Sequence, residues 1–334
     1  MVAALLLLWQ RRRPLSCGLR EMKARLACLV LLAATPACAQ VLPQGKEAAP
    51  GAYLSKSVKP DLAFGAFQRG FYVTAMKEAQ KRLAEDPKDA AAMVLIGELY
   101  QDGLGVRPSA KEALSWYRRA ADLGNASGAF RLGIAYLRGE DLPVDEAQAR
   151  RYLEAAAAKG HATALYQLGM MQLEGELQNP AKAAEDFRKA ALAGSHEAAY
   201  ALGLLYKDGR GVGRDKAEAA RWFKQAAAEN LVAAQIDYAI MLFNGDGIAR
   251  DEGQAAKLFQ KAAGRGNPVA ANRLARLYAT GRGVDKNMIE AMKWHLLARS
   301  SGVKDDWLDA QLNTLSPAER RAVEEGLRKQ IGGP

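Results

Sequence analysis

The chain has 334 residues, of which 49% are hydrophobic, 7% aromatic and 25% charged. About one residue in five is alanine, which favours helices built from small side chains and excludes a disordered or collagen-like chain. The formal net charge is +10. Residues 1–39 contain six of the 47 basic side chains and one of the 37 acidic ones, so residues 40–334 carry only +5. With both signs interleaved, this charge is not the pattern of a nucleic-acid-binding protein, and no nucleic-acid partner is expected.

The beginning of the chain has the pattern of a secretory signal. Lys23 and Arg25 form a short basic region directly after Met22. An apolar stretch follows at residues 26–34, and small side chains at residues 37–39 form a cleavage site. We therefore expect residues 1–39 to be a signal-peptide region whose true start is Met22.

Export follows from this pattern. We expect cleavage before Gln40, which places the mature chain in the periplasm of a Gram-negative bacterium or outside the cell.

The apolar stretches at residues 2–9 and 26–34 are shorter than the ~20 residues that cross a bilayer as a helix, so the mature chain is expected to have no transmembrane span. All three cysteines lie within the first 39 residues, so the mature chain is stabilised by packing without disulfides. Residues 40–60 are predicted to be a flexible lead-in.

The rest of the chain repeats itself with a period of about 36 residues. It realigns at Asp89, Asn125, His161, Ser195, Leu231 and Asn267, with spacings of 36, 36, 34, 36 and 36 residues. The six copies occupy residues 89–124, 125–160, 161–194, 195–230, 231–266 and 267–302. Residues 61–88 look like a degenerate leading hairpin. Residues 303–334 are predicted to be a C-terminal cap, in which a closing helix begins after Ser316 and continues to about Gln330.

Each copy contains the signals of two helices joined by a turn. In the first helix an apolar or aromatic residue precedes a small one, as in Ile96-Gly97 and Leu202-Gly203. The turn is Gly-x-Gly-Val or Gly-x-Gly-Ile in four copies, and its first glycine suits a left-handed helix cap. The second helix begins after an N-cap residue type in all six copies: Ser109, Asp145, Asn179, Asp215, Asp251 and Asn287. In five of them Glu or Gln stands three residues later, which predicts a capping box.

These motifs closely resemble the SEL-one-like repeat, a helical-hairpin relative of the tetratricopeptide repeat, over residues 89–302. The resemblance implies an all-α fold, an α-solenoid of about seven antiparallel hairpins closed by a C-terminal capping helix. The third copy departs from the pattern, because it is two residues shorter and has Asp186 at the position of the usual tryptophan.

Motifs for catalysis, cofactors and metals are absent or explained by the repeat. His196-Glu197 is followed by Tyr200 and not by the second histidine that a zinc-hydrolase helix requires. The glycines at 209, 211 and 213 follow a helix rather than a strand, so they are interpreted as the turn of the repeat and not as a phosphate loop. We predict no catalytic residue, no cofactor and no metal.

The first helices are the most informative variable region, because they line the concave surface in tetratricopeptide-like arrays. Apolar residues recur there at helical spacing and are interpreted as packing between repeats: Phe130, Ile134, Leu137, Tyr166, Met170, Leu173, Ile236, Ile240 and Phe243. Other positions differ in charge between copies, so packing does not dictate them. The hypothesis is that these contact a partner: Arg131, Gln167, Asp237, Arg273 and Arg276.

The resemblance also implies a function. Exported proteins of this type are expected to be non-enzymatic scaffolds that bind another protein, as adaptors or regulators of envelope signalling, by presenting a preorganised helical surface. One alternative is a cell-wall glycan-binding module, which needs exposed Tyr and Trp side chains. A further alternative is an envelope hydrolase, such as the penicillin-modifying activity ascribed to cysteine-rich relatives, and the absence of cysteines after cleavage weakens that analogy.

Overall fold

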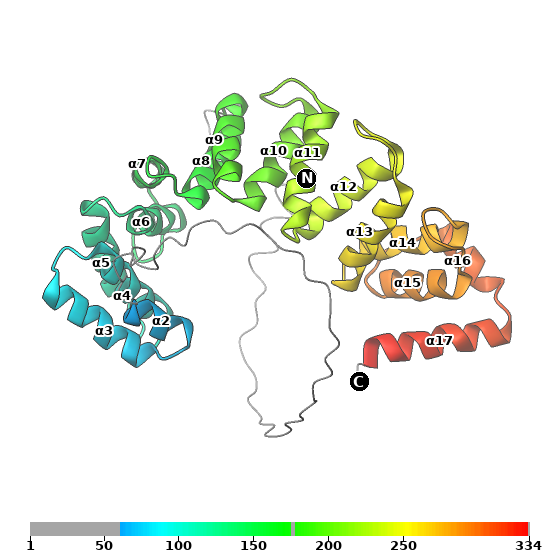
Figure 1. Cartoon of the computed structure of the whole chain (residues 1–334), viewed down its shortest axis with the longest axis horizontal. Helices are drawn as coiled ribbons and strands as arrows, with labels where there is room; N and C mark the ends of the chain where they lie inside the picture. The colour runs from blue at the N-terminus through cyan, green and yellow to red at the C-terminus, as the bar shows by residue number, and fades with distance from the viewer. Residues whose placement is uncertain (1–60, 175–177, 333–334) are drawn as a thin grey trace, which may run out of the picture. The chain divides into compact units, whose positions relative to one another are not determined.

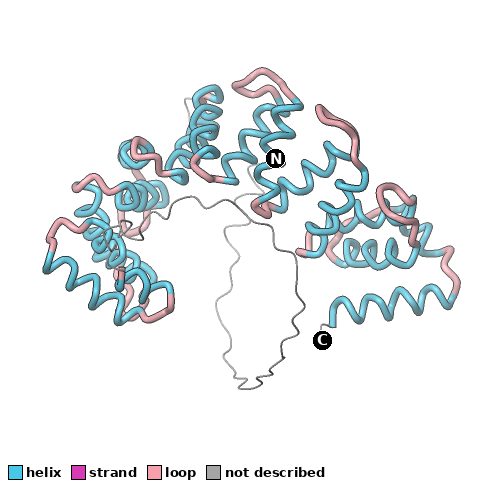
Figure 2. The backbone as a smooth tube through the Cα atoms, viewed as in Figure 1, coloured by secondary structure: helices cyan, strands magenta, loops and turns pink. Residues whose placement is uncertain are grey.

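The computed structural model describes residues 61–174 and 178–332. Figure 2 shows that these residues form helices joined by turns and loops, and no strand occurs among them. The predicted all-α fold is thereby confirmed. The signal-like region and the lead-in, residues 1–60, lie outside the described residues.

The helices follow one another as hairpins along the chain (Figure 1). The leading hairpin is α2 (Leu62–Gln68) with α3 (Tyr72–Glu85), and the repeats are α4 (Ala90–Asp102) with α5 (Ala110–Asp122), α6 (Ala126–Arg138) with α7 (Glu146–Ala157), α8 (Ala162–Glu174) with α9 (Pro180–Leu192), α10 (His196–Asp208) with α11 (Lys216–Ala228), α12 (Val232–Asn244) with α13 (Glu252–Gly264), and α14 (Pro268–Thr280) with α15 (Met288–Ser300). The cap consists of α16 (Asp306–Asn313) and α17 (Pro317–Gly332). Each first helix packs on the second helix of its own repeat, which packs on the first helix of the next repeat. This arrangement confirms the predicted α-solenoid.

The N-cap residues of the second helices act as predicted, but the capping boxes do not form in full. Asp251 accepts a hydrogen bond from the backbone N–H of Gln254 at 2.8 Å. In the described part of the six repeats, the Glu or Gln side chain three residues later does not accept a hydrogen bond from the backbone N–H of the N-cap residue. That N–H already donates to a carbonyl of the first helix: the nitrogen of Asp251 lies 2.9 Å from the carbonyl oxygen of Leu242. The capping-box prediction is therefore right for the bond accepted by the N-cap side chain and wrong for the reciprocal bond from the N-cap N–H. A complete box forms at the closing helix, where Ser316 and Glu319 each accept from the other's backbone N–H.

The glycine inside the first helices makes room for a bulky side chain of the second helix. A Cβ atom on Gly203 would lie 2.6 Å from the ring of Phe223, and one on Gly97 would lie 2.4 Å from the ring of Tyr117. Glycine within a helix costs about 1 kcal/mol relative to alanine. Close approach offsets this cost, because the ring of Phe223 is fully buried and Tyr117 is only 2% exposed.

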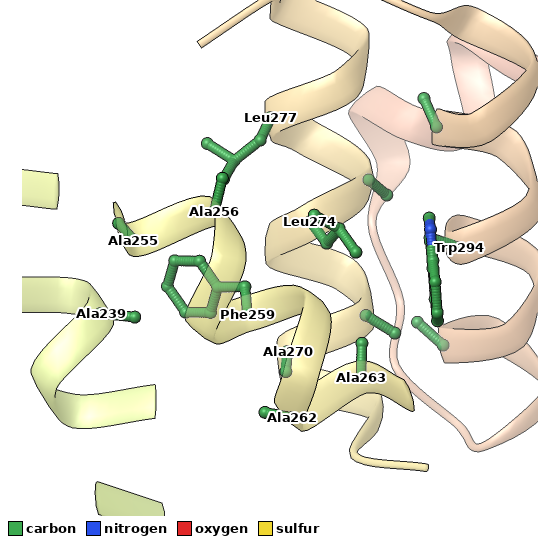
Figure 3. Close-up of a cluster of buried hydrophobic side chains, with 14 of the residues drawn as sticks. Ala239, Ala255, Ala256, Phe259, Ala262, Ala263, Ala270, Leu274, Leu277 and Trp294 are labelled. Carbon is green, nitrogen blue, oxygen red and sulfur yellow. The ribbon is translucent and has the colours of Figure 1, made fainter. Parts of the chain in front are cut away.

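Alanine-rich helix faces surround these large side chains. Figure 3 shows the cluster in the last repeats, where the ring of Phe259 lies near Ala239 of the preceding helix and Leu274 of the following one. Small side chains let the helices approach closely, and each ring fills the space between them. The core therefore continues from one repeat to the next.

The turns fix the contact between neighbouring repeats. Gly247 has a φ of +72°, and a Cβ atom there would lie 2.5 Å from the carbonyl carbon of Lys216, the first residue of α11. In the second repeat Asp141, with a φ of +52°, takes the place of this glycine. Asn230, with a φ of +65°, takes the place of the glycine that ends the other repeats. Asp and Asn are the side chains that tolerate this backbone conformation best.

Candidate partner-binding surface

One side of the first helices carries partly exposed apolar side chains through four consecutive repeats. They are Phe130, Ile134 and Leu137 of α6, Tyr166, Met170 and Leu173 of α8, Tyr200 and Leu204 of α10, and Ile236, Ile240 and Phe243 of α12. We call this set the first-helix surface. These side chains contact the core clusters, as predicted for packing between repeats, but each also keeps part of its area open to solvent.

Two of the five predicted partner-contact residues link neighbouring first helices. Arg131 of α6 donates to the carboxylate of Glu98 on α4 at 2.7 Å. Asp237 of α12 accepts from the hydroxyl of Tyr200 at 2.8 Å and from the ammonium of Lys207 at 3.4 Å, both on α10. Burial, together with the nearby charge of Asp237, raises the pKa of the Tyr200 hydroxyl, so this group remains a neutral donor.

Arg276 connects the last repeat to the cap. Its Nε and Nη2 atoms donate to the carboxylate of Asp305 at 2.7 and 2.8 Å, and Asn272 donates to the same carboxylate at 2.8 Å. The side chain of Asp305 is only 3% exposed. Burial opposes its ionisation, but these charged and amide donors outweigh burial and lower the pKa of Asp305 to about 2.

The remaining two predicted residues lie on α8 and α14. Gln167 is partly buried on α8 and Arg273 is exposed on α14. Neither makes a side-chain hydrogen bond or ion pair with any other residue in the described ranges. The structure therefore brings Arg273 and Arg276 together on one helix, one turn apart, and distributes Arg131, Gln167 and Asp237 over three other helices.

A hollow of about 390 Å³ opens on this side of the molecule between α12, α14 and α16. One part of its lining is apolar and comprises Ile240, Phe243 and Trp307, while another part comprises the arginines Arg273, Arg276 and Arg282. The hollow thus continues the first-helix surface at its C-terminal end and adds positive charge to it.

Aromatic rings hold two of these arginines in place. The guanidinium of Arg282 lies 4.0 Å from the ring centroid of Phe243, and that of Arg276 lies 5.6 Å from the ring centroid of Trp307. Such cation–π contacts are attractive, more so where water is excluded. Arg282 also donates to Glu252, and together with Arg250 it lowers the pKa of that carboxyl to about 2. Contacts within the protein therefore position both guanidinium groups at the hollow.

Sequence reasoning missed Arg282 and Trp307. Arg282 is the variable residue of a Gly-x-Gly turn, so the charge variation that singled out Arg273 was also present there. Trp307 follows the last repeat, where the period assigns no positions. The neighbouring Leu308 is fully buried, whereas Trp307 is 41% exposed and lines the hollow.

The described residues were searched for groups that could hold a metal ion and for helices that could span a membrane. Within residues 61–174 and 178–332, no cluster of His, Cys, Asp and Glu side chains is suited to hold a metal ion. No helix in the same ranges is long and apolar enough to span a membrane. His196, which begins the near match to a zinc motif, has its Nε2 atom 3.2 Å from the carboxylate of Glu197.

The model of the Sel1 repeat family matches six consecutive segments of the chain: residues 90–125, 126–161, 162–195, 196–231, 232–267 and 268–303. The protein belongs to the Sel1 repeat family. Sel1 repeats are scaffolds that commonly mediate protein interactions, and their fold is typical of non-catalytic repeat proteins.

The chain is also similar to proteins of known structure. A Sel1 repeat protein from Oxalobacter formigenes is 29% identical, and its structure superposes with a TM-score of 0.60 over 74% of this chain and all of that one. A protective antigen present in uropathogenic Escherichia coli strains is 24% identical, with a TM-score of 0.48 over 78% of this chain and 64% of that one. No curated protein matches the chain.

Proposed function

We propose that this Sel1 repeat protein is an exported, non-enzymatic scaffold that binds another protein along the first-helix surface. The observation that carries the proposal is the continuity of that surface, because partly exposed apolar side chains line up over four consecutive repeats. Extended apolar surfaces of this kind mark interaction sites in soluble proteins. A helical groove can receive an extended segment or a helix of a partner.

The bacterial envelope is the proposed place of action. Residues 22–39 combine a basic region, an apolar stretch and a small-residue cleavage site. An adaptor or a regulator of an envelope signalling protein fits this location. N-terminal sequencing of the protein from a periplasmic fraction should begin at Gln40, and retention of the whole chain in the cytoplasm would contradict the proposal.

Binding of a protein is favoured over binding of cell-wall glycan. Sugar recognition uses flat aromatic side chains on the surface, but Trp222 is 3% exposed and Trp294 is 8% exposed, so both belong to the core. Trp307 is 41% exposed, and Trp116 on α5 is partly exposed, with the guanidinium of Arg119 over its ring. Most of the apolar side chains on the first-helix surface are aliphatic, which suits contact with another protein.

Cross-linking in intact cells tests the proposal. The chain is expressed from Met22, cross-linked, purified and analysed for what co-purifies. One dominant envelope protein is expected, and it should be lost when Met170→Glu and Ile240→Glu place charges on the first-helix surface. Leu192→Glu is the matched control, because Leu192 is 75% exposed on α9. Enrichment of wall fragments without a stoichiometric protein would overturn the proposal, and circular dichroism checks that each variant is folded.

A further inference from the structure

The hollow between α12, α14 and α16 contains more positive than negative charge. Three arginines line it, and the carboxylates of Asp305 and Glu252 each already accept hydrogen bonds from one of them. Arg273 forms no ion pair with any residue of the described ranges, and it is exposed. The paired carboxylates therefore leave at least one guanidinium charge uncompensated in the hollow.

The paired arginines still have donors to offer. Arg276 uses Nε and Nη2 on Asp305. Arg282 uses the corresponding Nε and Nη2 atoms on Glu252. A guanidinium carries five N–H bonds, so the Nη1 group of each arginine is left for another acceptor. Because their positions are set by ion pairs and aromatic rings, these donors lose little conformational freedom when a ligand binds.

The apolar lining narrows the class of ligand. Ile240, Phe243 and Trp307 lie within the same hollow as the arginines. A small inorganic anion would satisfy the arginines and leave this apolar part uncovered. A carboxylate-bearing side chain beside an apolar one would satisfy both, since carboxylates match the planar guanidinium group and the apolar side chain buries against the rings.

We propose that this hollow binds an acidic segment of a protein partner, in which an Asp or Glu side chain lies next to an apolar side chain. The inference rests on the proposed function and adds to it the chemistry of the partner. The positive charge of the arginines favours a carboxylate as the bound group. The occupant is proposed to be a polypeptide because Ile240 and Phe243 belong both to the hollow and to the first-helix surface.

Fluorescence anisotropy with a labelled peptide tests this chemistry. The probe is fluorescein-Gly-Ser-Asp-Glu-Leu-Phe-Glu-Asp-Ser-Gly, and its control has Asn and Gln in place of Asp and Glu. The acidic probe should bind and the control should bind at least about tenfold more weakly. Arg273→Ala should weaken binding of the acidic probe about fivefold to tenfold, as expected for loss of charge-assisted hydrogen bonds. Binding should also weaken as salt rises from about 50 to 300 mM.

Arg221→Ala is the matched control, because Arg221 is an exposed arginine on α11, outside the first-helix surface and outside the hollow. This variant should bind the acidic probe as the natural protein does. Equal binding of the acidic and neutral peptides, or equal losses in the two arginine variants, would overturn the inference. So would displacement of the probe by inorganic phosphate at about 1 mM, because the hollow would then be a simple anion site.

The two proposals fail separately. If a protein co-purifies in the cross-linking experiment and Met170→Glu abolishes it while Arg273→Ala and Arg273→Glu do not, the scaffold function stands and the acidic-segment inference is wrong. Loss of the same protein in Arg273→Glu, but not in Arg221→Glu, supports the inference. Absence of any protein partner refutes the proposed function itself.

Discussion

Arg276 and Asp305 form a two-point ion pair between the last repeat and the cap. The guanidinium donates through Nε at 2.7 Å and through Nη2 at 2.8 Å. The same carboxylate accepts from the backbone N–H of Leu308 at 3.2 Å, as the N-cap of α16. One buried side chain therefore both starts the first helix of the cap and holds it against α14.

Asp305→Asn should weaken the attachment of the cap in a pH-dependent way. The pKa of Asp305 falls from its ordinary 3.8 to about 2 in the folded protein, so its ionised form stabilises the fold above pH 4 and this contribution is lost as pH falls toward 2. We expect a loss of about 2 kcal/mol at pH 7, as for hydrogen bonds to charged groups. Urea unfolding measures it at pH 7 and pH 3, and the difference from the natural protein should shrink at the lower pH.

Asp306→Asn is the control for this prediction, because Asp306 is the exposed neighbour of Asp305 in the first turn of α16. It should change the free energy of unfolding by less than about 0.5 kcal/mol. Equal losses in the two variants would show that the helix N-terminus alone, without the ion pair to Arg276, accounts for the effect.

Gly203→Ala should destabilise the fourth repeat, although alanine is the better helix former. Its Cβ atom would meet the ring of Phe223 at 2.6 Å, and that ring is fully buried. Overpacking of this kind costs about 1–3 kcal/mol. Gly264→Ala is the matched control in α13, where a Cβ atom meets nothing within 4 Å, so it should be neutral or stabilising by up to ~1 kcal/mol. Thermal unfolding compares the two, and a stabilised Gly203→Ala would contradict the explanation of the glycine.

Two glycines in turns separate the cost of a close contact from the cost of a left-handed backbone conformation. Gly247 and Gly266 have φ angles of +72° and +82°, but only Gly247 lies against another backbone, that of Lys216. Gly266→Ala should cost about 1 kcal/mol, the penalty of a left-handed conformation alone. Gly247→Ala should cost about 2–4 kcal/mol, because the repeats must also move apart. Similar losses in urea unfolding for both variants would refute the role of the turn in repeat contact.

The fold was accessible from the sequence because its signals are local. The period places each helix, and N-cap residues such as Asp251 start the helices where predicted. The missing half of the capping box could not be foreseen, since the N–H of Asp251 bonds to Leu242, across the turn. Local signals thus predict where a helix begins. They do not predict whether the N-cap N–H donates to the side chain three residues later or to a carbonyl of the preceding helix.

The candidate site was less accessible, because it depends on how repeats stack. The variation in charge led to the prediction that Arg131, Asp237 and Arg276 contact a partner, and this stays a prediction. Their contacts within the chain, to residues 29–37 positions away, were not foreseen. Whether position 131 reaches Glu98 depends on the angle between successive helices, which the period does not specify. The contribution of Trp307 was missed because it lies in the cap, where the period assigns no positions.

The buried carboxylate of Asp186 should behave in the opposite way to Asp305. It stands where Trp222 stands in the next repeat, it is 7% exposed, and it accepts from the amide of Gln172 at 3.0 Å. Burial raises its pKa above the ordinary 3.8, so the folded protein binds this proton more tightly, and stability falls as pH rises above that value. Asp186→Asn removes the buried charge and keeps a polar group for Gln172. It should stabilise the protein by about 1 kcal/mol at pH 7, and this gain should vanish below about pH 4. Glu154→Gln, at an exposed position of α7, should show neither effect in urea unfolding. A destabilised Asp186→Asn at pH 7 would show that the charge is compensated in the folded state.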